Sequence, residues 1–589
     1  MNERNKSLIE CVLDWTAPVA GTSRTIPGLK LLSSYDSFIQ YNKEWSAIVT
    51  TEFLIEMDQD AMRPLGRPVA ILLSGREFAH PTYGQIAFGA RGPMTDCILR
   101  VENSGYCFFH FESKKIFMSR ISEVAFRGES ELFFSGVDFK AALLRFSGID
   151  HLKKSNWMGK ILAGRCPPVG QKLQSETCQG HAIRSCLDGE SGTWLWQGPP
   201  GTGKSKTIAD LIKKIGTDVP VLAMAHSNDA VLNLLDELLS SGIRQTDISW
   251  CVSKQRLKEF PPESRYLRFI NSHNNPTTTA RVFLSTCSHS VVLSPMVFTW
   301  VIVDEAAFCP EHDSLVALMR LNDDPQVTSK FLLVGDPAQL SPVMKCSATV
   351  QNFASLMARC MVESCGSTVT FDISYRVGSL CAEFLRDTFY PLCTTFRAND
   401  DHQLLMQRML KSGDPFPEMT FLDVPHGAEV KKGTSYVNDG EAEQVIILAQ
   451  RLIENGVLVQ DIVAIAPYAE QVELIEEKIK EVSGCIGIQA KTVHGMQGTE
   501  SKFVIMSTVR SDNAHTAGFI DEPHMICVSL SRQKTFLVVL GHAKFLHQHT
   551  HHWSNFLRFL NDKGHCVESL AFLNDSTRGD LVDGMVENN

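Results

Sequence analysis

The chain has 589 residues, too many for one hydrophobic core, so we expect three or four domains. Its composition, with 44% hydrophobic and 21% charged residues, is that of a soluble globular protein. The formal net charge of −10 excludes a wholly basic nucleic-acid coat protein. A motor whose basic residues line only one channel remains possible, because binding depends on where the charge lies.

The sequence contains no apolar span of about 18 residues, and its amino terminus lacks a signal-peptide pattern. The 17 cysteines include no C-x-x-C pair, which indicates buried thiols rather than a zinc framework or a disulfide scaffold. We therefore expect a cytoplasmic or nuclear protein that makes no contact with a membrane.

The amino-terminal third shows two kinds of pattern. Residues 1–34 form an extension without a recognisable pattern, and aromatic and apolar residues then recur from position 35 at the spacing of a helix of about 25 residues. Between about 64 and 135 the pattern changes to five short β-rich runs, which predict a small β-barrel. Its aromatic residues either fill the barrel or stack on bases. These residues are Tyr106, Phe108 and Phe109. A second helical stretch over 138–162 follows.

The stretch QGPPGTGKSKT, residues 197–207, contains the full G-x-x-x-x-G-K-[ST] phosphate loop. A buried strand is predicted before it (193–196) and a helix after it (205–214). In such a loop, backbone N–H groups cradle phosphates, Lys204 reaches the β- and γ-phosphates, and the Ser205 hydroxyl binds Mg²⁺. The residues predicted to hold the nucleotide here are Gly198, Pro199, Pro200, Gly201, Thr202, Gly203, Lys204 and Ser205.

Buried strands alternate with helices throughout the rest of the chain. The strands VLAMA, RVFLST, WVIVD and FLLVG follow the phosphate loop, and a second set of strands and helices begins near residue 365. This alternation predicts an α/β fold with two doubly wound parallel sheets. A basic stretch at 240–280 interrupts the pattern and forms either a solvated face or an insertion that contacts phosphates. We expect domains at 171–362 and 363–556, with a tail at 557–589.

Two acidic residues end one of these strands. Asp304 is placed to hold Mg²⁺, and Glu305 to orient and deprotonate the attacking water. Gln339, in GDPAQL after the next strand, is placed to sense the γ-phosphate. Two arginines of the second set of strands, Arg376 and Arg532, could supply positive charge to the transferring phosphate.

Nine short motifs occur in one order: QGPPGTGKS, AHSNDAV, STCS, VDEAAF, GDPAQLSPV, SYRVGSL, APYAEQ, VHGMQGTES and SLSRQK. In this order they resemble the Upf-like group of superfamily 1 helicases over roughly residues 35–545. The resemblance implies two tandem RecA-like domains. It also implies that residues 35–170 form stalk helices that carry the β-barrel.

The resemblance also implies roles for individual residues. Gln179 and Tyr375 would contact adenine, and Glu500 the ribose or phosphate side of the nucleotide. Gln339, Arg376 and Arg532 would contact the γ-phosphate, with both arginines acting from the second domain. The residues that would touch the nucleic-acid backbone are Ser227, Asn228, Thr286, Pro467 and Thr492.

The sequence departs from the group's pattern at five positions. The group usually has Pro at the position of His226, Phe at Met496, Ala at Gln533, Met at Val377 and Thr at Ser531. None of these differences removes a charged catalytic group, so ATP hydrolysis should be retained. Whether they change the contacts with nucleic acid is a separate question that these residues do not decide. A group of histidines at 542–552 forms either a metal site or a set of solvated and capping side chains.

Together these patterns predict an ATP-dependent 5′→3′ helicase or translocase on single-stranded nucleic acid. It would use ATP and Mg²⁺, prefer RNA to DNA, work as a monomer and have protein partners in RNA metabolism. The polarity is implied by the resemblance alone. One alternative is an ATP-gated RNA clamp with ATPase activity but little unwinding. Another is a nucleotide-dependent switch that binds no nucleic acid.

Overall fold

The computed structural model describes most of the chain from residue 166 to residue 567. The gaps in this range are 175, 253, 262, 271–279, 294–295, 323, 325, 343–354, 364–367, 400–417, 434 and 512–516. Before residue 166, only the backbone of six strands between 67 and 132 is described. The predicted extension 1–34, both predicted stalk helices and the end of the tail lie outside the described residues.

The six amino-terminal strands form one antiparallel sheet in the order β4-β3-β2-β1-β5-β6. They are β1 (Arg67–Leu73), β2 (Thr82–Phe88), β3 (Asp96–Val101), β4 (Gly105–His110), β5 (Ile121–Gly128) and β6 (Glu131–Leu132). The predicted β-rich runs are therefore strands. In the described pairings β4 and β6 lie at opposite ends of the order, so the structure supports a sheet but not the predicted barrel. The side chains of the three predicted aromatic residues lie outside the described ones.

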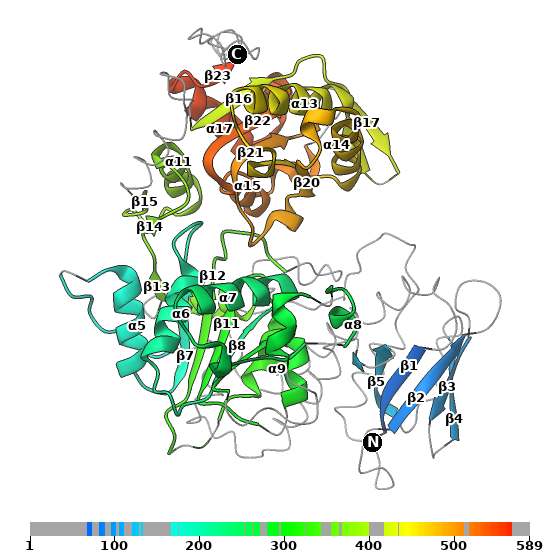
Figure 1. The fold of residues 1–589 in the computed structure, drawn as a ribbon, viewed down its shortest axis with the longest axis vertical. Helices are drawn as coiled ribbons and strands as arrows, with labels where there is room; N and C mark the ends of the chain where they lie inside the picture. The colour runs from blue at the N-terminus through cyan, green and yellow to red at the C-terminus, as the bar shows by residue number, and fades with distance from the viewer. Residues whose placement is uncertain are drawn as a thin grey trace. The chain divides into compact units, whose positions relative to one another are not determined.

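The chain divides into two compact units (Figure 1). The first contains Met1–Trp196, Ser205–Gly335 and Ser341–Val369. The second contains Gln197–Lys204, Asp336–Leu340 and Thr370–Asn589. The division therefore passes through the phosphate loop between Lys204 and Ser205.

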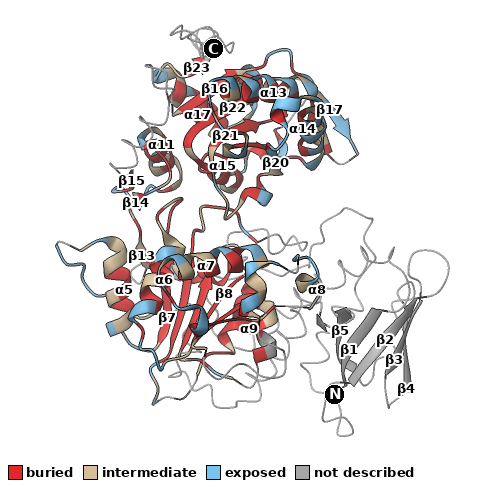
Figure 2. Ribbon diagram, in the orientation of Figure 1, coloured by how far each residue is buried: buried red, intermediate tan, exposed pale blue. Residues whose placement is uncertain are grey.

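A seven-stranded sheet forms the centre of the first unit. Its order is β13 (Thr368–Thr370), β7 (Gly192–Gln197), β12 (Lys330–Gly335), β11 (Trp300–Asp304), β8 (Val221–Ala225), β10 (Val282–Thr286) and β9 (Ile248–Trp250). Neighbours from β12 to β9 pair in parallel. Every residue of β8, β10, β11 and β12 is buried, as expected for a parallel sheet covered on both faces (Figure 2). Its helices are α5 (Cys178–Asp188), α6 (Lys204–Lys214), α7 (Asn228–Ser240), α8 (Lys254–Leu257), α9 (Glu311–Leu318) and α10 (Leu356–Glu363).

The second unit contains a six-stranded parallel sheet. Its order is β20 (Gln489–Thr492), β19 (Ile462–Ala466), β21 (Ser501–Ser507), β22 (Gln533–Gly541), β16 (Met419–Asp423) and β23 (Cys566–Val567). Two short pairs join β14 (Ile373–Ser374) to β15 (Arg397–Ala398) and β17 (Glu429–Lys432) to β18 (Ser435–Asn438). Its helices are α11 (Ser379–Phe389), α13 (Asp439–Glu454), α14 (Ala469–Glu481), α15 (Pro523–Ser529), α16 (Ala543–His549) and α17 (His552–Asp562).

The structure therefore confirms a mixed α/β protein with parallel sheets. In a parallel sheet every strand ends at the same edge, so the loops that follow the strands meet there and commonly form the binding site. Eight of the nine short motifs found in the sequence end a strand or follow one, whereas SLSRQK follows α15 and leads into β22. None of the described cysteines forms a disulfide, and none of the described helices has the length and apolarity needed to cross a membrane.

Candidate nucleotide site and strand-end loops

The phosphate loop lies between β7 and α6, as the sequence predicts. Gly201 and Gly203 have φ angles of 72° and 76°, in the left-handed region that side chains disfavour. A Cβ atom on Gly201 would also lie 2.4 Å from Cβ of Arg376. Glycine is thus required at position 201 both for the turn and for the close approach of a second segment.

That second segment contains two of the residues predicted to contact the nucleotide. Ser374 Oγ donates a hydrogen bond to the Pro200 carbonyl at 2.8 Å, and the Tyr375 N–H donates to the Gly201 carbonyl at 2.8 Å. Tyr375 itself is 51% exposed, so its ring is available to pack on a base. The structure thus brings Tyr375 and Arg376 to the phosphate loop.

The side chains of the loop hold it in shape. Lys204 Nζ donates to the Gly198 carbonyl at 2.7 Å, and Thr202 Oγ1 donates to the Pro199 carbonyl at 2.8 Å. A Cβ atom on Gly198 would lie 2.4 Å from Cγ of Lys204. The absence of a side chain at position 198 therefore lets the lysine lie against the loop whose N–H groups would bind phosphate.

Ser205 and Asp304, the two predicted Mg²⁺ ligands, contact each other directly. Ser205 Oγ donates to Asp304 Oδ2 at 2.7 Å, and Asp304 is buried at the end of β11. A hydroxyl and a carboxylate are oxygen ligands of the kind that Mg²⁺ prefers. These two residues therefore fit the metal that the sequence predicts.

Glu305 has a strained backbone. Its φ angle is 51°, whereas a residue with a side chain rarely adopts a positive φ. Its N–H donates to Oδ1 of Asp304 at 2.9 Å, which helps to hold this conformation. Strain of this kind concentrates at functional sites, where the surrounding structure must support it.

A chain of hydrogen bonds within the second unit fixes Gln339 and Arg532. Gln339 Nε2 donates to Asp336 Oδ2 at 2.7 Å, and Arg532 donates to Gln339 Oε1 at 3.0 Å. Tyr390 donates to the same Asp336 oxygen at 2.6 Å. Burial, with Asp336 beside it, raises the pKa of Tyr390 well above its ordinary value, so the phenol stays a donor. Sequence reasoning missed Asp336 and Tyr390, although Asp336 lies in the same GDPAQL motif as Gln339.

The positive charges of Lys204 and Arg532 both lower the pKa of one buried thiol, that of Cys527. Burial raises the pKa of the Cys527 thiol, and the positive charges of Arg532 and Lys204 oppose that rise. The loop lysine and this arginine, more than 300 positions apart in the sequence, therefore lie near the same thiol.

Arg376 and Glu500, both predicted to contact the nucleotide, form an ion pair. Arg376 Nε donates to Glu500 Oε2 at 2.5 Å, and Lys534 pairs with the other carboxylate oxygen. Burial alone would raise the pKa of Glu500, but these two cations hold it below its ordinary value. Glu500 is therefore an anion that positions Arg376 beside the loop.

The remaining predicted site residues lie at strand ends or helix starts. Gln179 is the second residue of α5 and half-buried, with Thr177 capping the helix. Ser227 caps α7, whose first residue is Asn228, because its Oγ accepts from the Ala230 N–H at 3.2 Å. Thr286 ends β10, and its Oγ1 accepts from the His289 N–H.

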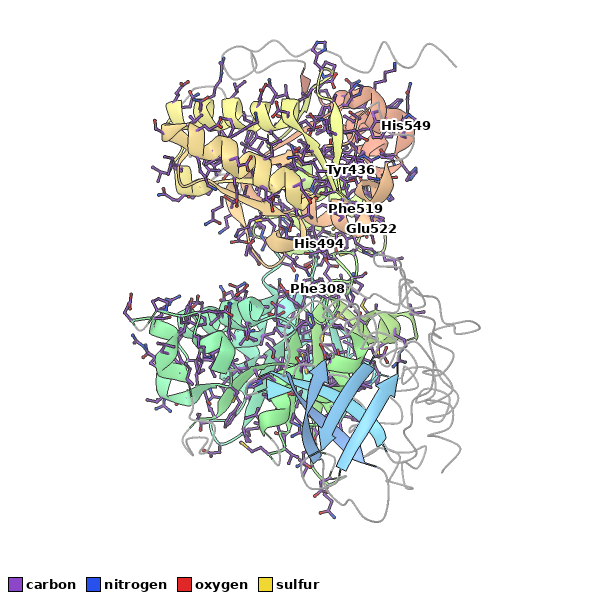
Figure 3. The ribbon with its side chains drawn as sticks, turned by 90° about the vertical axis from the view of Figure 1, so that its right-hand side faces the viewer. Phe308, Tyr436, His494, Phe519, Glu522 and His549 are labelled. Atoms are coloured by element: carbon purple, nitrogen blue, oxygen red, sulfur yellow. The ribbon has the colours of Figure 1, made fainter. Side chains whose placement is uncertain are left out.

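In the second unit, Pro467 follows β19 and is buried, and Thr492 ends β20. Tyr468, next to Pro467, packs its buried ring between Tyr436 and Phe519, both labelled in Figure 3. This aromatic packing fixes the loop after β19. Each unit thus presents its predicted nucleic-acid residues at the carboxyl edge of its own sheet.

Several arginines of the basic stretch at 240–280 are paired with acids. Arg244 pairs with Asp247, Arg256 with Asp229 and Glu259, and Arg265 with Asp236. These contacts favour the solvated-face interpretation, because they neutralise charge that would otherwise attract phosphates.

The carboxy-terminal histidines have structural partners. His542 caps α16 by accepting from the Phe545 N–H at 3.2 Å, and His547 hydrogen-bonds with Ser554. Within the described part of the chain, they do not form a group that could hold a metal ion. The structure therefore favours the interpretation of these histidines as capping side chains.

Two family profiles match the chain. Both are described as an AAA domain, one over residues 174–259 and 264–347 and the other over 353–544. The ATP-dependent helicase upf1 of Schizosaccharomyces pombe is 27% identical over 491 residues, which are 72% of this chain and 52% of that protein. The putative helicase MOV-10 of Gallus gallus is 26% identical over 67% of this chain and 47% of its own length. The DNA polymerase alpha-associated DNA helicase A of S. pombe is 27% identical over 62% and 63%. The chain thus spans about half to two thirds of these relatives.

Proposed function

Because this chain belongs to the Upf-like group of superfamily 1 helicases, we propose that it is an ATP-dependent helicase or translocase on single-stranded nucleic acid. The observation that carries this proposal is the hydrogen bond between Ser205 and Asp304. It joins the phosphate loop to a carboxylate at the end of a neighbouring strand, which is the arrangement that holds Mg²⁺ on a nucleoside triphosphate. When bound, the ion would neutralise charge on the phosphates.

The residues of this chain would divide the work of hydrolysis. Lys204 and the N–H groups of the loop bind phosphate, and Glu305 holds and deprotonates the attacking water. Arg532, which Gln339 and the backbone already hold in place, would stabilise negative charge on the transferring phosphoryl group. Arg376 would act in the same way from beside Gly201.

The two parallel sheets support a pair of RecA-like domains at about 171–362 and 363–556. Stalk helices within 35–170 that carry the amino-terminal β-sheet belong to the same proposal. Movement along a strand would come from alternating contacts of the two strand-end edges with the nucleic-acid backbone, which are independent of base sequence. The proposal includes the 5′→3′ direction that the resemblance implies and RNA as the preferred track, although one relative is named as a DNA helicase.

Four of the five departures from the group's pattern are buried. Val377, Met496, Ser531 and Gln533 are each at most 1% exposed, so they affect packing rather than a surface that touches nucleic acid. Only His226 is partly exposed. The ATP-gated clamp was considered because these departures could weaken contacts with nucleic acid. Since four of them are buried, the structure favours a motor.

The test measures ATPase rates of the full chain with and without matched RNA and DNA oligonucleotides, together with strand displacement from duplexes with 5′ or 3′ overhangs. Lys204→Ala is the control for hydrolysis, since it removes the phosphate-binding ammonium. We expect stimulation by single strands and displacement from a 5′ overhang. ATPase stimulation without strand displacement would favour the ATP-gated RNA clamp. ATPase rates that do not change when nucleic acid is added would favour the nucleotide-dependent switch.

A further inference from the structure

A group of metal-binding side chains lies at the carboxyl edge of the sheet in the first unit. His226 follows β8 directly, Cys287 follows β10 directly, and Cys309 and Asp313 follow β11. The strands β11, β8 and β10 are consecutive neighbours in this parallel sheet. Four potential ligands therefore follow three adjacent strand ends at one edge of the sheet, although they are spread over nearly 90 residues of sequence.

The ligand atoms converge to the distances of a single coordination shell. One nitrogen of His226, the sulfur of Cys309 and a carboxylate oxygen of Asp313 all lie within 4.8 Å of one another. His226 Nδ1 and Asp313 Oδ2 are 3.3 Å apart. Two N or O ligands about 2.0–2.1 Å from a tetrahedral metal are separated by about 3.3 Å, so this spacing fits one shared ion.

The Nδ1 atom of His226 points into the cluster. It is buried, and the group paired with it is the carboxylate of Asp313, at the 3.3 Å given above but without the geometry of a regular hydrogen bond. The ring is held in this orientation by Phe308, which packs against it edge-on at 5.6 Å and is labelled in Figure 3. A buried imidazole nitrogen that faces both a carboxylate and a thiol is placed as a metal ligand would be.

A fourth donor adjoins these three. Cys287 and Cys309 are both fully buried, and the neighbouring Cys309 thiol helps to raise the pKa of the Cys287 thiol, so the two sulfurs lie near each other. We propose that His226, Cys309, Asp313 and Cys287 bind one Zn²⁺ ion. Two sulfurs, one imidazole nitrogen and one carboxylate oxygen suit tetrahedral Zn²⁺, whereas Mg²⁺ and Ca²⁺ take oxygen ligands.

Access and charge are both compatible with this ion. The side chain of His226 is 34% exposed, which gives an entry path to an otherwise buried cluster. Two thiolates and a carboxylate carry three negative charges that would be costly to bury alone, and Zn²⁺ offsets two of them. The site depends on a departure from the group's pattern, because the usual proline at position 226 has no ligand atom.

The zinc would connect two loops that have different tasks in the proposed function. His226 precedes Ser227 and Asn228, the predicted contacts with nucleic acid, and Cys309 lies four positions after Glu305. A metal crosslink between these loops would fix their relative position. This consequence rests on the proposed function, whereas the metal site itself does not.

The test begins with the full wild-type chain and needs no variant. The protein is purified with zinc present and dialysed, and its metal content is measured by mass spectrometry. It is then stripped and titrated with Co²⁺, whose visible spectrum reports tetrahedral thiolate ligation. We expect one zinc per chain and a thiolate-to-cobalt absorption band. A chain without zinc and without this band would overturn the proposal, whatever its ATPase activity.

Variants then assign the ligands. His226→Ala and Cys309→Ser should weaken Co²⁺ binding by about 100-fold or more, because each removes one donor. Cys186→Ser is the matched control, since Cys186 is also fully buried in the first unit but lies in α5 outside the cluster. Circular dichroism checks that each variant is folded. An unchanged cobalt spectrum in folded His226→Ala would refute the assignment, as would an equal loss in Cys186→Ser.

Discussion

The positive φ of Glu305 makes a prediction that links stability to hydrolysis. A residue with a side chain pays about 1–2 kcal/mol in the left-handed region, where its Cβ approaches the following carbonyl oxygen, and glycine avoids most of that cost. At an ordinary position glycine is less stable than alanine by about 0.5–1 kcal/mol. At position 305 the order should be reversed, with Glu305→Gly more stable than Glu305→Ala by about 1 kcal/mol.

Comparing these two variants isolates the backbone effect, because both lack the carboxylate. For a domain of this size, about 1 kcal/mol corresponds to a shift of roughly 2–4 °C in the unfolding temperature. Tryptophan fluorescence is a suitable probe, since Trp194, Trp196, Trp250 and Trp300 all lie in the first unit. If the alanine variant unfolds at the same temperature as the glycine variant or above it, the backbone at position 305 is not strained.

Variants at position 305 should also show whether the strained residue is needed for hydrolysis. Glu305→Gln keeps the size of the side chain but removes the base, so we expect the turnover rate to fall by about 10²–10⁴-fold while ATP still binds. Glu305→Gly should be as inactive as Glu305→Gln, although it should be more stable than Glu305→Ala. The strained backbone at this position would then lower stability in exchange for activity. Normal turnover by Glu305→Gln would refute the role of this carboxylate.

Three further outcomes are expected. Ser205→Ala removes the hydroxyl that contacts Asp304, so hydrolysis should need a higher Mg²⁺ concentration, and an unchanged Mg²⁺ titration would contradict the metal role. Arg532→Ala should lower kcat by about 1000-fold or more with little change in KM for ATP, because the arginine is held beside Gln339 for the transition state; a change in KM alone would oppose this. Burial raises the pKa of Glu441 from 4.5 to about 7, so the neutral acid stabilises the fold at low pH, and up to about 3 kcal/mol is lost as the pH rises from about 4.5 through 7. Thermal unfolding between pH 5 and 8 should therefore fall more for the wild type than for Glu441→Gln, and parallel slopes would contradict the shift.

The parts of the site that could be predicted are those that local chemistry fixes. The phosphate loop needs glycines at fixed offsets, and its Lys204 and Ser205 follow at once, so one short stretch predicts both the loop and the helix after it. The position of Asp304 was equally predictable, since a continuous buried strand ends directly at a carboxylate. In these cases each residue is placed by its immediate neighbours along the chain.

Other contacts could not be predicted because they join distant segments. The pairing of Tyr390 with Asp336 spans 54 residues, and that of Arg376 with Glu500 spans 124. The amino-terminal strands were predictable from alternating residues, but closure of a barrel depends on pairing between the first and last strands, which no local pattern specifies. The backbone strain at Glu305 had no signal either, because nothing about a glutamate indicates a positive φ.

The buried departures also bear on how the chain works. Ser531 keeps the hydroxyl that a threonine would have, and it accepts from Arg532 at 3.0 Å while donating to the Val528 carbonyl at 3.2 Å. The sulfur of Met496 accepts a hydrogen bond from Thr499 Oγ1 at 3.2 Å. These two side chains are buried and position loops that carry charged groups. The one partly exposed departure, His226, instead lies in a cluster of potential metal-binding groups. The chain therefore keeps the charged groups needed for hydrolysis and differs from its group in how the strand-end loops are held, which is where its distinct properties should lie.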